Sequence, residues 1–263
     1  MRIRLNNGLT NETTIYWHGL PVPPDQDGNP MDPVGAGTSR VTNTIWKVEP
    51  PAPIGTHPHP HNRTAEQTVR GLAGPLIVRA DDDPLAHLPE ATLFITGLRL
   101  DSNADVAADD ALDWTVGRQG EVLLVNGGRL PVHTVRPGVT ERWRIVNATS
   151  ARHFRLALEG HTLTMVGTDG GLLGALIADL PEVLIGPAQR VEVLVTVNPA
   201  PDARYRLRAL RFETDFLGFG KYSDDDLLTL ATTSEPPATA AFVPTSLCVG
   251  SQTRLSARDR LAP

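Results

Sequence analysis

Cysteine is nearly absent from this 263-residue chain, which contains only Cys248. A single cysteine excludes a disulfide within the chain, an iron–sulfur cluster and a cysteine-rich zinc site. Any metal chemistry must therefore use histidine and carboxylate side chains. Lysine is also scarce, and 24 basic against 30 acidic residues give a net charge of −6. Because nucleic-acid binding draws its affinity from a basic surface, we expect no nucleic-acid partner.

Long apolar runs are missing as well. No stretch approaches the roughly 18–20 apolar residues of a membrane helix, so we expect no membrane span. The opening residues, MRIRLNN, lack the apolar segment of a signal peptide. Export, if it occurs, is expected to depend on sequence outside this chain. The hydrophobic fraction of 40% is nevertheless sufficient for a packed core.

The pattern of the remaining residues is typical of an all-β protein. Gly 23 and Pro 23 are spread along the chain, which favours many short elements over long helices. Valines alternate through 191–197, and Trp143 and Ile145 alternate with Arg142 and Arg144. This alternation predicts half-buried antiparallel strands. Further strands, each bounded by Gly, Pro, Asn or Asp residues typical of turns, are predicted at residues 91–100, 121–126, 153–158 and 163–166. Short strands at this spacing indicate a sandwich or barrel.

The charged, proline-containing stretch Asp81–Pro84 separates two halves of the chain and is typical of a linker. We therefore expect a first domain at residues 1–83 and a second at 84–233. Residues 234–263 are rich in Pro, Ala, Thr and Ser and lack periodicity. They are predicted to be a linker or a disordered tail.

Histidines gather in one segment, His57-Pro58-His59-Pro60-His61. The prolines favour an extended chain, in which residues i and i+2 point to the same side. His57 and His59 are therefore expected to project together. Neutral imidazole is a good copper, zinc or nickel ligand, so the pair predicts half of a metal site. An exposed loop with adventitious metal affinity is the alternative interpretation.

A second segment adds one more histidine. Between residues 13 and 20, strand alternation places Tyr16 and His18 on one face, opposite Ile15 and Trp17. A lone histidine after tryptophan is ordinarily a structural residue. Together with the first segment, however, it closely resembles the N-terminal region of bacterial multicopper oxidases, the group of copper-efflux oxidases and laccases. The motifs that carry the resemblance are Thr13–Leu20, Asp27–Pro30, His57–His61, Arg63–Gln67, Gly71–Gly74, Leu124–Gly127, Arg142–Ala148, Thr168–Gly171 and Val191–Val195.

The resemblance implies an all-β fold of tandem cupredoxin-like Greek-key β-sandwiches, the first one incomplete at its N-terminus. It implies copper as the cofactor and a trinuclear cluster that reduces dioxygen while a small reducing substrate, a phenol or cuprous ion, is oxidised. By position, His18, His57 and His59 correspond to type 3 copper ligands, whereas His61 falls outside the ligand pair. The family also implies a periplasmic or extracellular location.

The sequence departs from the family at several points. Tyr16 stands where the family has its type 2 copper histidine, and a phenol with a pKa near 10 is a poor copper ligand. Cys248 lacks the flanking histidines of the type 1 copper His-Cys-His motif. We therefore expect a further cupredoxin domain or subunit to supply the remaining ligands, and whether this chain alone is an enzyme stays open.

Two other functions fit the same residues. One is a non-catalytic cupredoxin scaffold, as in the family's copper-free branch associated with cell division. The other is a copper-binding protein without turnover. Four further histidines are expected to be surface or packing residues: His87, His133, His153 and His161.

Overall fold

A computed structural model describes residues 2–43, 53–216 and 219–247 of the chain. Cys248 lies outside these residues. The described part is built of strands and two short helices, α1 (Thr64–Val69) and α2 (Ala111–Val116), which confirms the all-β prediction. The first region contains β1 (Arg2–Asn6), β2 (Tyr16–His18), β3 (Ser39–Asn43), β4 (Pro53–His57) and β5 (Gly74–Ile77). The second contains β6 (Glu90–Leu98), β7 (Val122–Val125), β8 (Val132–Val135), β9 (Thr140–Asn147), β10 (Phe154–Leu158), β11 (Leu163–Thr168), β12 (Gly171–Leu180), β13 (Val183–Ile185), β14 (Arg190–Thr196), β15 (Arg204–Leu210), β16 (Phe212–Phe216), β17 (Phe219–Tyr222) and β18 (Asp225–Thr232).

The second region is a two-layer β-sandwich. One layer has the strand order β12-β11-β14-β9-β6-β7 and the other β13-β10-β15-β18-β8. The core between them contains Trp143 and Ile145 of β9, Val193 of β14, and Leu156 and Leu207 of the opposite layer. The strands predicted from alternation and from the turns between them are confirmed to within about two residues, which is ordinary for strand ends.

The outward face of β9 differs from the prediction. Alternation predicted that Arg142 and Arg144 face water, but both are only 1% exposed. Arg142 and Arg144 donate to the two carboxylate oxygens of Glu192 at 2.5 and 2.9 Å. Arg142 also donates to Asp83 at 2.6 Å, and Arg144 to Glu90 at 2.6 Å. The prediction of a half-buried strand was wrong because the segment around Asp83 and Glu90 crosses this face and pairs with both guanidinium groups.

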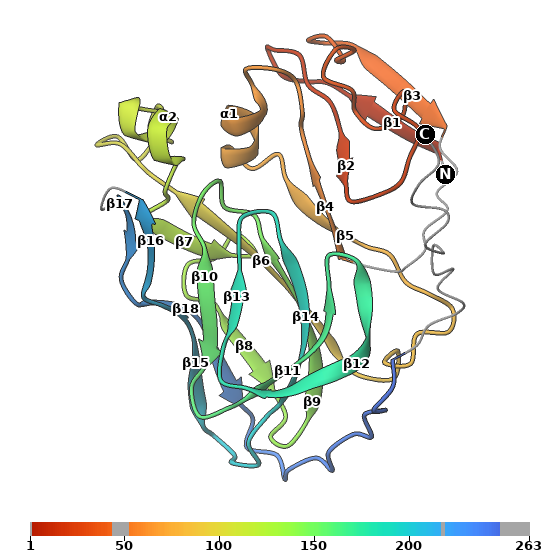
Figure 1. Cartoon of the computed structure of the whole chain (residues 1–263), viewed down its shortest axis with the longest axis vertical. Helices are drawn as coiled ribbons and strands as arrows, with labels where there is room; N and C mark the ends of the chain where they lie inside the picture. The colour runs from red at the N-terminus through yellow and green to blue at the C-terminus, as the bar shows by residue number, and fades with distance from the viewer. Residues whose placement is uncertain (1, 44–52, 217–218, 248–263) are drawn as a thin grey trace.

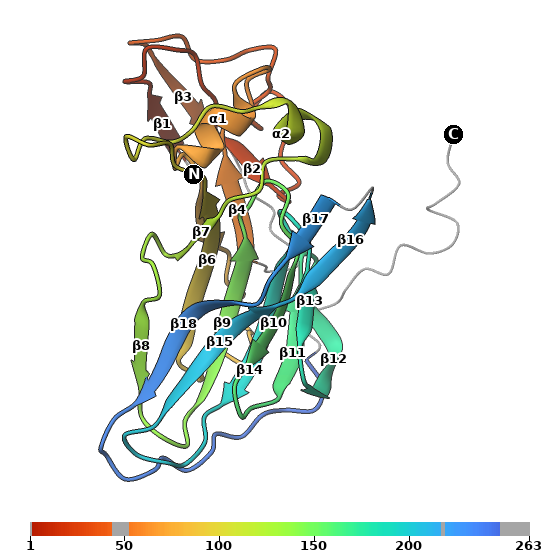
Figure 2. The same ribbon diagram turned by 90° about the vertical axis from the view of Figure 1, so that its left-hand side faces the viewer.

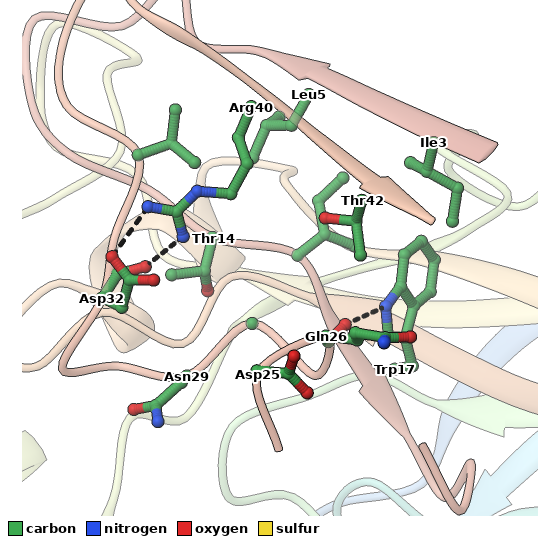
Figure 3. Close-up of a pocket in the computed structure, with 13 residues that line it drawn as sticks. Ile3, Leu5, Thr14, Trp17, Asp25, Gln26, Asn29, Asp32, Arg40 and Thr42 are labelled. Atoms are coloured by element: carbon green, nitrogen blue, oxygen red, sulfur yellow. Dashed lines mark hydrogen bonds and ion pairs between the residues drawn. The ribbon is translucent and has the colours of Figure 1, made fainter. Parts of the chain in front are cut away.

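The first region is smaller and lies at one end of the sandwich in both views (Figures 1 and 2). It consists of a two-stranded sheet, β1-β3, and a three-stranded sheet, β2-β4-β5. Trp17, in the middle of β2, is buried between them. Its Nε1 donates to the Gln26 carbonyl at 3.1 Å, as Figure 3 shows. Burial of Trp17 fixes which face of β2 looks inward and therefore turns Tyr16 and His18 the other way.

The hollow beside Trp17, drawn in Figure 3, is lined by Ile3, Leu5 and Thr42 of the facing sheet. Its volume is only ≈ 40 Å³. Small-molecule sites usually occupy about 300–1,000 Å³, so this space is too small for a substrate pocket.

The chain after β18 returns to the sandwich. Leu247 is buried in a small cluster with Leu85 and Leu88, and Ala241 and Val243 pack against the same cluster. The segment that connects the two regions and residues 241–247 therefore share apolar contacts. No helix in the described ranges is long and apolar enough to cross a membrane.

Candidate metal centre

Two neighbouring strands bring the predicted histidine segments together. Strand β2 pairs antiparallel with β4, with Tyr16 opposite His57 and His18 opposite Gly55. Side chains on one face of such a pair lie side by side. Because Gly55 has no side chain, the space opposite His18 stays open for its imidazole. The alternation in β2 and the register with β4 thus place Tyr16, His18 and His57 on one face.

The rings form a compact group. The centroid of the His57 ring lies 5.5 Å from that of His18 and 5.8 Å from that of His59. His18 Nδ1 and His57 Nε2 are 3.3 Å apart. The structure therefore brings His18, His57 and His59 together. His61 is exposed.

The tyrosine lies in the middle of this group. The Tyr16 ring centroid is 5.8 Å from that of His18, 5.1 Å from His57 and 5.0 Å from His59. The residue that departs from the family pattern is therefore in contact range of all three imidazoles.

One hydrogen bond orients the His57 ring, and another holds the backbone of His59. His57 Nδ1 lies 2.9 Å from the Pro58 carbonyl, which can only accept, so this nitrogen carries the proton and Nε2 is left as an acceptor facing His18 Nδ1. The backbone N–H of His59 donates to Thr14 Oγ1 at 2.8 Å, which ties this residue to the segment before β2. His59 Nδ1 is buried and has no hydrogen-bond partner among the described residues.

The surroundings favour neutral imidazoles. Burial is the largest cause that lowers the pKa of His18, and the positive charge of Arg190 lowers it further. Burial also lowers the pKa of His57. Neutral rings keep the lone pairs that a metal ion needs.

These groups fit copper but form only part of a ligand set. The donors are imidazoles, which suit copper, and a lone pair of His57 points at a nitrogen of His18. Within the described residues, no group of three or more His, Cys, Asp or Glu side chains is placed to hold one metal ion. The arrangement therefore provides a pair of donors plus one neighbour, and a complete coordination shell needs ligands from elsewhere.

The remaining histidines have contacts remote from this group, as predicted. His87 bonds the Phe242 carbonyl, and His133 bonds Glu141 at 2.8 Å. His153 stacks on Phe212, and His161 accepts from the Asn198 N–H at 3.1 Å.

One residue near the centre escaped the sequence analysis. Arg190 begins β14 in the second region, yet its Nε donates to the Pro53 carbonyl of β4 at 3.0 Å. With Tyr16, His18 and Asp169 it borders a hollow of ≈ 510 Å³. An arginine ahead of an apolar strand is the only trace of this contact in the sequence, because the partner is 137 residues away.

Comparison with known proteins finds a separate match for each of the two regions of the chain. Two sequence models described as multicopper oxidase match it, one over residues 1–83 and the other over residues 88–222. The chain is 28% identical to the multicopper oxidase mco of Staphylococcus aureus, over 79% of this chain and 46% of that protein. It is 30% identical to the cell division protein FtsP of Xenorhabdus nematophila, over 75% of this chain and 42% of that protein.

Comparison with solved structures points to the same family. A multicopper oxidase from Campylobacter jejuni, described as a metallo-oxidase, superposes with a TM-score of 0.84 at 36% identity, covering 94% of this chain and 51% of that one. This likeness confirms the predicted cupredoxin-like sandwiches. The chain spans about half the length of the relatives it matches. It belongs to the multicopper oxidase family, whose members bind copper.

Proposed function

We propose that this chain supplies part of the ligand set of a copper cluster that reduces dioxygen. His18, His57 and His59 are the type 3 copper ligands of this proposal. The observation that carries it is the 3.3 Å approach of His18 Nδ1 to His57 Nε2, two neutral donors from separate segments. His59 Nδ1 in the same group adds support: it is buried and has no partner in the part of the chain that the structure describes, whereas a buried polar atom ordinarily has one.

Each residue has a distinct task in this proposal. His18 and His57 would together hold one copper ion, and His59 would present its ring to a second. Trp17 and the β2–β4 register keep the rings in place. Copper, when bound, supplies the electron transfer that couples dioxygen reduction to oxidation of a phenol or cuprous ion. The remaining ligands come from a further cupredoxin domain or subunit. The setting is periplasmic or extracellular, as the family resemblance implies.

Copper binding and oxygen uptake test this function together. We expect the purified chain to bind copper but to consume no oxygen with a phenol or cuprous ion as reductant. Adding a separate cupredoxin domain that carries a His-Cys-His motif is expected to start oxygen consumption, because the cluster then gains its missing ligands. An oxygen electrode and metal analysis of the gel-filtered protein measure both quantities. A chain that retains no copper would contradict the proposal.

A non-catalytic scaffold is the second candidate. Tyr16 at the centre of the imidazole group and the likeness to a cell division protein favour it. A scaffold retains no copper under the conditions above. A copper-binding protein without turnover retains copper but stays inactive after the His-Cys-His domain is added and bound. The same two measurements therefore separate all three functions.

A further inference from the structure

A buried arginine of the second region reaches the two strands that carry the histidines. Arg190 is 5% exposed, and its Nε donates to the carbonyl of Pro53, the first residue of β4. His57 is the last residue of the same strand. A charged side chain is costly to bury unless its donors are satisfied, so a contact of this kind is specific.

The same guanidinium touches the chain directly after His18. Gly19 has φ +93°, a left-handed conformation that favours glycine. A Cβ at Gly19 would lie 2.7 Å from Arg190 Nη2, which is closer than real contacts allow. The glycine therefore permits Arg190 to pack against the end of β2, beside His18.

Asp169 holds the guanidinium in this position. It lies in the turn between β11 and β12, and its Oδ1 accepts from Arg190 Nη1 at 2.7 Å and from the Arg190 backbone N–H at 2.8 Å. Arg190 Nη1 also donates to the Ala188 carbonyl at 3.2 Å. The side chain is thus bonded to Asp169 and Ala188 of the second region and to the first residue of β4, and it packs against Gly19 after β2.

We propose that Arg190 is a positioning residue that sets the distance between His18 and His57. It hydrogen-bonds the start of β4 and packs against Gly19, directly after β2, from one point of the larger sandwich, so a shift of β4 would break a buried hydrogen bond and a shift of β2 would open or close the space beside Gly19. This inference rests on the proposed function for its consequence, copper affinity, but not for the geometry itself. The lowering of the His18 pKa by Arg190 is in keeping with this proximity.

The test uses the full chain and two readouts. The first is Cu(I) affinity, measured by competition with the chelator bicinchoninate. The second is the set of histidine ring signals in ¹H–¹⁵N spectra of copper-free protein. Arg190→Gln removes the charge and most donors, whereas Arg190→Lys keeps the charge but lacks the planar fork. Arg155→Gln, which breaks a surface pair with Glu182, is the matched control for loss of an arginine.

Arg190→Gln is expected to bind Cu(I) about tenfold more weakly, at the lower end of what partners beyond the direct ligands contribute. The Cu(I) affinity of Arg190→Lys is expected to lie between that of Arg190→Gln and that of the unchanged chain. If Arg190→Gln does not fold, Arg190→Lys serves as the test variant. Ring signals of His18 and His57 should shift in both variants but not in Arg155→Gln.

A merely structural role is tested by Leu156→Ala, a core truncation in the second sandwich that lowers stability without touching the histidine strands. If it weakens copper binding as much as Arg190→Gln, or if the Arg190 variants bind copper and show ring signals like the unchanged chain, the inference is overturned. If the unchanged chain binds no copper, the proposed function fails, and the ring signals alone still decide the role of Arg190.

Discussion

Replacing His57 by alanine is expected to weaken Cu(I) binding at least about a hundredfold, because even partners beyond the direct ligands change metal affinity by about 10–100-fold. His57 Nε2 is the atom that faces His18 Nδ1, so its loss removes one of the two donors that converge. Competition with bicinchoninate measures the change. His161→Ala, which removes a histidine engaged by Asn198 in the other region, serves as the control and should bind copper like the unchanged chain.

A double variant makes this prediction sharper. If His18 and His57 hold the same ion, His18→Ala alone should cost about as much as His57→Ala. The double variant should then lose little more than either single variant, since each already breaks the shared site. Independent, additive losses would mean that the two imidazoles bind separate ions, which contradicts the pairing.

Replacing Glu192 by alanine is expected to lower the free energy of unfolding by about 3–5 kcal/mol, because it leaves two buried guanidinium groups without their shared carboxylate. Glu192 is 0% exposed, and its two oxygens accept from Arg142 and Arg144. Urea unfolding followed by circular dichroism measures the loss. Glu182→Ala breaks the surface pair with Arg155 and is the control, with an expected cost of about 0–1 kcal/mol.

Glu192→Gln separates charge from shape. The amide keeps one acceptor oxygen but cannot neutralise the two arginines, so its stability should fall between that of Glu192→Ala and the unchanged chain. A Glu192→Ala cost below about 1 kcal/mol would mean that Asp83 and Glu90 suffice to compensate both arginines, which would contradict the essential role of Glu192 in burying them.

Local patterns in the sequence predicted much of the fold. Alternation around Trp143 and through 191–197 gave the inward faces of β9 and β14, and glycine-containing turns gave the strand ends. Which residues cover the outer face of a strand, however, depends on contacts between segments that are far apart in the sequence. Nothing in the residues around Arg142 indicates that Asp83, 59 positions away, covers the outer face of β9. The alternation was right and its interpretation as a water-facing side was wrong.

At the candidate site too, local features could be predicted from the sequence and long-range contacts could not. Strand alternation predicted that Tyr16 and His18 share a face and that His57 and His59 project together. The register that sets Tyr16 opposite His57 came only with the paired strands. Arg190 could not be predicted, because its role depends on contacts with Pro53 and Gly19 across the boundary between the two regions.

The central claim is that His18 and His57 hold one copper ion between them. Crystals of the chain soaked with copper, measured at the copper absorption edge, test it directly through the anomalous signal. We expect a peak about 2 Å from both His18 Nδ1 and His57 Nε2, the usual length of a metal–imidazole bond. Copper found only at other histidines, or a space between these two rings that stays empty while copper binds elsewhere, would contradict the account.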